Sequence, residues 1–145
     1  LHLCDRRQRQ MCIRDSARAA LITRGIAELA RLGVAMGCNV HTFAGLAGIG
    51  DLIVTATSMH SRNNRAGILI GKGETPEQAV KEVGMVVEGM NALPAALELA
   101  AKYQVEMPIV QTVNAIVNKG MSAAEAVKSL MERGLKNELP QGYEK

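Results

Sequence analysis

The sequence predicts an all-α fold, and three observations lead to that prediction. Apolar residues recur at helical spacing in several segments of the chain. At Thr75 and at Ser122, a hydroxyl residue is followed three residues later by Gln or Glu, which is typical of a helix start. No segment shows the sustained alternation of apolar and polar residues that is typical of a half-buried strand. At 145 residues with 48% hydrophobic content, the chain is long enough to bury the core of one domain.

The first helix is predicted over residues 17–36, with Gly37 at its end. Its apolar residues lie at helical spacing between arginines and a glutamate: Ala20, Leu21, Ile26, Leu29, Ala30 and Val34. We expect a short segment to follow, capped by Thr42 and running through Leu46.

The stretch of residues 45–67, GLAGIGDLIVTATSMHSRNNRAG, carries most of the polar chemistry of the chain. Its first glycines suit a tight turn, and the apolar run of residues 52–54 is predicted to form one or two helical turns. The β-branched residues of that run also suit a short strand. As a helix, the segment places Asp51 and Thr55 on the same face, because they are four residues apart.

Ser61 is the predicted N-cap of a helix that carries residues 68–70 into the core and ends in the glycines of residues 71–73. Free backbone N–H groups at a helix start attract an anion, and Ser61, Arg62 and Asn63 add donor side chains there. Arginine suits phosphate because its planar guanidinium donates to two oxygens at once. The sequence therefore predicts an anion site at this helix start.

Thr75, followed by a proline and by Gln78, predicts a capped helix that runs through Val83. We expect residues 86–89 to form an extended or turn-like connector. Asn91 is then predicted to cap a further helix that runs to about residue 103 and tolerates a proline in its first turn.

Two more helices are predicted toward the carboxyl end. Pro108 opens the first of them and Gly120 closes it. Ser122 and Glu125 form a capping box at the start of the second, and Gly134 is expected to end it. We predict that this helical domain occupies residues 17–138 and that residues 139–145 form a flexible tail.

The first sixteen residues, LHLCDRRQRQMCIRDS, differ from the rest of the chain because they show no helical or strand period. We expect residues 1–16 to be a non-native, linker-like head, and a basic N-terminal arm or a targeting peptide is the alternative. The head holds four arginines and two aspartates, which leaves the rest of the chain nearly neutral. That balance indicates neither a nucleic-acid surface nor an anionic-membrane surface.

Other features of the composition narrow the functional class. Aromatic residues make up 2% of the chain, too few for stacking on single-stranded nucleic acid. No apolar run approaches the roughly 20 residues that a membrane span needs. Outside the head Cys38 is the one cysteine, so the sequence predicts neither disulfides nor a metal site, and it favours the cytoplasm.

The pieces GLAGIGDL, TATS and SRN, with the following Gly67, closely resemble the substrate-binding segment of the prokaryotic NAD(P)-dependent glycerol-3-phosphate dehydrogenases. The resemblance continues in residues 17–33, 84–92, 107–109 and 131–134, and covers the chain from Ala17 to about Glu138. It implies an all-helical carboxy-terminal domain of the 6-phosphogluconate-dehydrogenase-like type.

The resemblance also implies roles for single residues. Asp51 would bind a substrate hydroxyl or hold the ammonium group of the catalytic lysine, and Thr55 would donate a hydrogen bond to the substrate. Ser61, Arg62 and Asn63 would hold the substrate phosphate. Without the resemblance, Asp51 is simply a helix-start carboxylate, and the other residues cap and solvate a helix.

Cofactor contacts follow from the same resemblance. The resemblance implies that NAD or NADP would lie beside Arg62, Val86 and Glu88. Without the resemblance, Glu88 is interpreted as a solvated residue of a connector. A carboxylate there can accept hydrogen bonds from ribose hydroxyls or nicotinamide. His41 and His60 are assigned no role, because nothing near them in the sequence supplies a nucleophile or a metal spacing.

The chain has neither G-x-G-x-x-G nor a βαβ pattern for a dinucleotide. The resemblance places the Rossmann domain and the acid/base lysine upstream of Ala17, so we expect no catalytic residue in this chain and no turnover by it alone. The whole enzyme would interconvert sn-glycerol 3-phosphate and dihydroxyacetone phosphate and supply phospholipid synthesis. Two alternatives remain: a standalone helical module that binds a phosphorylated small molecule or mediates homodimer contacts, and an oxidoreductase with another substrate.

Overall fold

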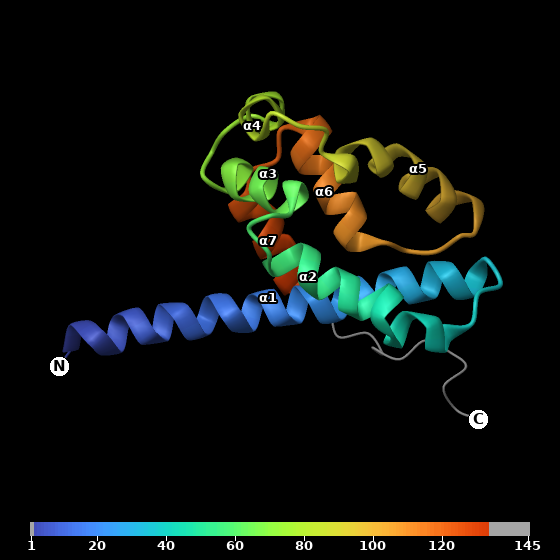
Figure 1. The fold of residues 1–145 in the computed structure, drawn as a ribbon, viewed down its shortest axis with the longest axis horizontal. Coiled ribbons are helices and arrows are strands. Elements are labelled where there is room, and N and C mark those ends of the chain that lie inside the picture. The colour runs from blue at the N-terminus through green and yellow to red at the C-terminus, as the bar shows by residue number, and fades with distance from the viewer. Residues whose placement is uncertain (1, 134–145) are drawn as a thin grey trace.

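The computed structural model describes residues 2–133, with side chains from Asp15 onward, and within that range it contains helices and no strand (Figure 1). The predicted all-α fold is confirmed. Two of the elements are short: η1 is a 3₁₀ turn and η2 is a π turn. In chain order the elements are α1 (His2–Ala35), η1 (Val40–Ala44), η2 (Leu46–Gly50), α2 (Asp51–Thr57), α3 (Arg62–Gly71), α4 (Pro76–Val83), α5 (Glu88–Lys102), α6 (Pro108–Lys119) and α7 (Ala123–Glu132).

The long helix α1 lies along one side of the other helices, and its amino-terminal part extends past them (Figure 1). It begins at His2, so the predicted helix start at Ala17 is wrong, although residues 2–16 show no helical period in the sequence. Backbone helicity does not report where a segment came from, so the non-native origin of residues 1–16 stays a prediction. Gly134 and the tail of residues 139–145 lie outside the described residues.

Charged side chains of α1 meet the ends of two other helices. The guanidinium of Arg24 donates to the carbonyl of Leu130, in the last turn of α7, at 2.8 Å. The carboxylate of Glu28 accepts the N–H of Ile109, in the first turn of α6. A cation at a helix carboxyl end and an anion at an amino end both match the helix dipole. These two contacts dock α6 and α7 on α1.

The core consists of two small apolar clusters. One joins α1, α5 and α6 through Leu32, Ala100 and Met107. The other joins α3 with α4 and the segment before α5, through Ala66, Val83 and Val87. The second cluster brings the start of α5 close to α3, which positions the functional groups described below.

Helix starts with a local signal lie where the sequence predicts them. Thr75 and Gln78 form a capping box on α4, and Ser122 and Glu125 form another on α7. The oxygen of Ser61 accepts the N–H of Asn64, which confirms it as the cap of α3. The run of residues 52–54, which also suited a strand, is helical.

Two predicted caps are wrong. Asn39, not Thr42, caps η1, because its side-chain oxygen accepts the N–H of His41 at 2.9 Å as in an Asx turn. That turn ends at Ala44, short of the predicted end at Leu46.

The second wrong cap is Asn91, which lies inside α5, because that helix begins at Glu88. The predicted connector of residues 86–89 is therefore non-helical at Val86, extended at Val87 and helical from Glu88 onward. Its proline, Pro94, lies in the helix interior. None of the helices in residues 2–133 combines the length and the apolar character that a membrane span requires.

Candidate functional site

A pocket of about 470 Å³ opens between α2, the start of α3 and the start of α5. Its volume falls in the range of about 300–1,000 Å³ that is usual for small-molecule sites. Polar groups dominate its lining, which consists of Asp51, Val54, Thr55, Ser58, His60, Ser61, Arg62, Asn63 and Glu88.

Asp51 is the first residue of α2, and the turn before it depends on glycine. A Cβ on Gly48 would lie 2.2 Å from the carbonyl oxygen of Phe43, so the chain can turn this tightly only with glycine there. The π turn of η2 then leads directly into α2. Thr55 follows Asp51 by about one helical turn, and both residues line the pocket.

The start of α3 faces α2 across the pocket. The Ser61 oxygen accepts the N–H of Asn64 at 3.2 Å, and the Asn64 side-chain amide donates to the carbonyl of Ser58 at 2.9 Å. These bonds tie the loop of residues 58–60 to the helix start. Because the first N–H groups of a helix have no acceptor within it, an anion in the pocket would meet donors there.

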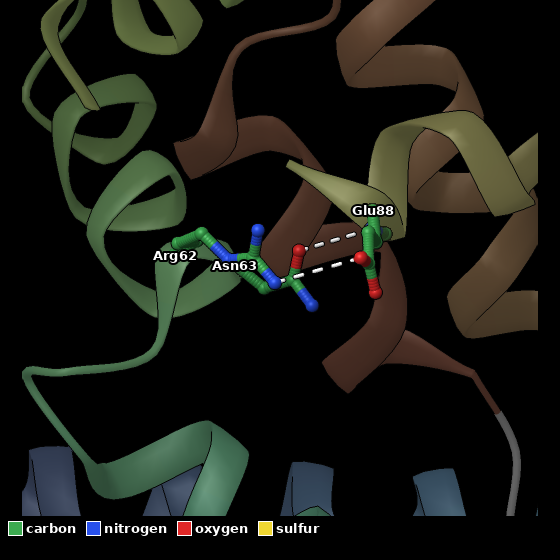
Figure 2. Close-up of polar contacts among 4 residues, drawn as sticks. Arg62, Asn63 and Glu88 are labelled. Atoms are coloured by element: carbon green, nitrogen blue, oxygen red, sulfur yellow. Dashed lines mark hydrogen bonds and ion pairs between the residues drawn. The ribbon is translucent and has the colours of Figure 1, made fainter. Parts of the chain in front are cut away.

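The start of α5 completes the pocket (Figure 2). The Arg62 guanidinium lies 3.5 Å from a carboxylate oxygen of Glu88, and the Asn63 side-chain oxygen accepts the N–H of Gly89 at 2.9 Å. The Glu88 side chain is 73% exposed, so its pairing with Arg62 is weak and leaves the guanidinium available to a ligand.

All five residues predicted to bind substrate line this one pocket: Asp51, Thr55, Ser61, Arg62 and Asn63. Glu88 lines it too, whereas Val86 does not and is 57% exposed. The structure therefore brings together all of the predicted site residues except Val86. Their individual roles stay predictions.

Three lining residues were not predicted: Val54, Ser58 and His60. Ser58 and His60 lie in the short loop that joins α2 to α3, and the N–H of His60 bonds the Ser58 hydroxyl at 3.1 Å. The loop is short and joins two helices that both carry predicted site residues. This proximity in the sequence is the signal that would have pointed to Ser58 and His60.

The side chains at the rim of the pocket fit a dinucleotide. Arg62 offers donors and Glu88 offers acceptors on the same edge, and such groups suit phosphate oxygens and ribose hydroxyls. Val86 provides apolar surface one residue before the cap of α5. Residues 2–133 hold no strand, so they contain no βαβ unit of their own for the dinucleotide.

Comparison with known proteins identifies the family of this chain. The family model described as NAD-dependent glycerol-3-phosphate dehydrogenase C-terminus matches residues 8–128. The resemblance was expected to begin at Ala17, and the family match instead reaches back into the helical head.

Named relatives and a solved structure extend the match. The chain is 65% identical over 125 residues to glycerol-3-phosphate dehydrogenase (NAD(P)+) 2 of Lactobacillus delbrueckii subsp. bulgaricus. The aligned region covers 86% of this chain and 37% of the relative. The chain is 58% identical to the corresponding enzyme of Fusobacterium nucleatum, with the same coverage. The crystal structure of glycerol-3-phosphate dehydrogenase from Coxiella burnetii matches with a TM-score of 0.79 and 40% identity, covering 81% of this chain and 36% of that one.

The chain thus spans little more than a third of the length of these relatives. The family match covers most of the sequence and agrees with the all-helical fold. This chain belongs to the NAD-dependent glycerol-3-phosphate dehydrogenase family and corresponds to its carboxy-terminal domain.

Proposed function

We propose that this chain is the substrate-binding part of an NAD(P)-dependent oxidoreductase that interconverts sn-glycerol 3-phosphate and dihydroxyacetone phosphate. The observation that carries the proposal is the shared pocket, in which the carboxylate of α2 faces the arginine-bearing start of α3. The names of the relatives support the same reaction. The product would supply glycerophospholipid synthesis in the cytoplasm.

Each side of the pocket has its own task in this proposal. The start of α3, with Ser61, Arg62 and Asn63, holds the phosphate through charge-assisted hydrogen bonds. Asp51 and Thr55 orient the hydroxyl-bearing carbons, since a carboxylate accepts hydrogen bonds from hydroxyls. This division places the two ends of a three-carbon phosphate ester on different helices.

NAD or NADP supplies the hydride chemistry when it is bound. The residues of this chain expected toward that group are Arg62, Glu88 and Val86, of which Arg62 and Glu88 line the pocket. The family resemblance implies that the dinucleotide fold and the acid/base lysine lie upstream of the region that begins at Ala17, so the 145-residue chain alone should bind substrate without turning it over. Measurable turnover by the purified 145-residue chain would contradict this separation of substrate binding from catalysis.

A binding experiment on the full chain tests the phosphate site. sn-Glycerol 3-phosphate is titrated into ¹⁵N-labelled wild type, Arg62→Ala and Arg65→Ala, and binding is followed by NMR. Arg65 is the matched control because it lies on α3 but does not line the pocket. Loss of a charge-assisted contact should weaken binding by about 10-fold or more in Arg62→Ala and little in Arg65→Ala. Equal losses, or no binding by wild type, would contradict the proposal.

A further inference from the structure

The start of α5 has no side-chain cap of its own. The residue before it, Val87, has no polar side-chain atom, and the cap comes from another helix instead. The side-chain oxygen of Asn63, in the first turn of α3, accepts the N–H of Gly89 at 2.9 Å (Figure 2). A residue that is distant in the sequence thus satisfies one of the free donors at this helix start.

The contact is so close that a side chain at position 89 would disturb it. A Cβ there would lie 2.9 Å from the Asn63 oxygen, 3.1 Å from its Cγ and 3.4 Å from its side-chain nitrogen. The clashing atoms are the far end of a side chain, so a larger residue would displace the Asn63 amide rather than the backbone. Gly89 therefore controls where that amide lies.

The bond also settles the orientation of the amide. With Oδ1 committed to Gly89, Nδ2 is the part of the amide left for a ligand, and within residues 15–133 it has no protein acceptor. The same contact keeps Glu88 next to Arg62, because Glu88 directly precedes Gly89 in α5.

We propose that Asn63 and Gly89 form a positioning contact, in which Gly89 orients the Asn63 amide for the phosphate and holds the Glu88 carboxylate beside Arg62. Gly89 is thus a positioning residue of the site although it has no side chain. The inference rests on the proposed phosphate role of the pocket. One part of its test, hydrogen exchange at the Gly89 amide, does not depend on that role.

Two substitutions of Asn63 separate its two functions. Asn63→Asp keeps an acceptor for the Gly89 N–H but loses the donor toward phosphate and adds a negative charge. Asn63→Ala loses both. Hydrogen exchange at the Gly89 amide, followed by NMR on the full chain, should stay slow in Asn63→Asp and rise by about fivefold or more in Asn63→Ala. Affinity for sn-glycerol 3-phosphate should fall in both variants.

Gly89→Ala provides the second arm, with Gly71→Ala as its control. A Cβ on Gly71, at the end of α3, would meet nothing within 4 Å. Alanine favours a helix over glycine, so neither variant should lose thermal stability from helix propensity. Gly89→Ala should nevertheless bind sn-glycerol 3-phosphate about 3- to 10-fold more weakly than Gly71→Ala, because the Asn63 amide is displaced.

The outcomes are distinct. Unchanged exchange at Gly89 in Asn63→Ala, or equal affinities of Gly89→Ala and Gly71→Ala, would overturn the positioning contact. If wild type bound no phosphate ester, the proposed function would fail, and the phosphate part of this inference would fail with it. The exchange arm would then still decide whether Asn63 caps α5.

Discussion

The carboxylate of Glu28 in α1 accepts the backbone N–H of Ile109 with both of its oxygens, at 2.8 and 3.1 Å. Glu28 is 3% exposed, and α6 has no side-chain cap of its own. Burial raises the pKa of Glu28, while hydrogen bonds from the Ile109 and Val110 backbone and the charges of Arg31 and Arg133 oppose that rise. A buried carboxylate thus serves as the cap of a distant helix.

The raised pKa predicts how stability changes with pH. The folded chain keeps the Glu28 proton at pH values where the unfolded chain has lost it, so the stabilisation from this shift is present below the ordinary pKa of about 4.3 and is lost as the pH rises through the folded value. Glu28→Gln keeps an acceptor but cannot ionise. Its free energy of unfolding relative to wild type should therefore increase between about pH 4 and pH 7 in urea titrations. A difference that does not change with pH would contradict this.

Glu28→Ala should be clearly destabilising at every pH. It leaves the first N–H group of α6 without its acceptor in a part-buried site. The cost of an unsatisfied buried donor is about 1–3 kcal/mol, and the lost packing adds to it. Urea unfolding of Glu28→Ala and Glu28→Gln, compared under the same conditions, measures how much the hydrogen-bond acceptor at position 28 contributes to the free energy of unfolding. Equal stabilities of the two variants would show that the hydrogen bond contributes nothing.

Gly33→Ala tests the packing of η1 on α1. A Cβ on Gly33 would lie 2.1 Å from the ring of Phe43, so the ring must move away. Overpacking of this kind costs about 1–3 kcal/mol. Gly67→Ala is the matched control, because a Cβ there would meet nothing within 4 Å and should stabilise α3 by about 0.5–1 kcal/mol. Thermal unfolding should move in opposite directions for the two variants.

Glu88→Gln tests the balance of charge at the pocket rim. Glu88 lies 3.5 Å from the Arg62 guanidinium, so in the proposed site it would compete with the substrate phosphate for Arg62. Its removal should tighten binding of sn-glycerol 3-phosphate about two- to threefold, the scale of an exposed ion pair, and this gain should shrink at high salt. Stability should change by less than about 1 kcal/mol. Weaker phosphate binding by Glu88→Gln in the same NMR titration would contradict competition.

Asp51→Ala tests which end of the ligand α2 recognises. Wild type should bind sn-glycerol 3-phosphate about 3- to 10-fold more tightly than 3-hydroxypropyl phosphate, which lacks the central hydroxyl. Asp51→Ala should bind the two compounds equally, because the acceptor for that hydroxyl is gone. Calorimetric titration measures both affinities. Discrimination that survives the substitution would place the hydroxyl elsewhere.

The sequence by itself determined the features that depend on neighbouring residues. Ser61, Thr75 and Ser122 cap helices within three residues of themselves, so their helix starts could be predicted from short segments. The motif in residues 45–67 likewise supplied the five side chains that were predicted to bind substrate, and these line one pocket.

Only the tertiary structure decided where α5 begins and how the pocket closes. The donors at the starts of α5 and α6 are satisfied by Asn63 and Glu28, which lie 26 and 81 residues away in the chain. A sequence pattern read over neighbouring residues cannot reveal such partners, because they become neighbours only when the helices pack. For the same reason the Asn63 contact, and with it the place of Glu88 beside Arg62, became visible only in three dimensions.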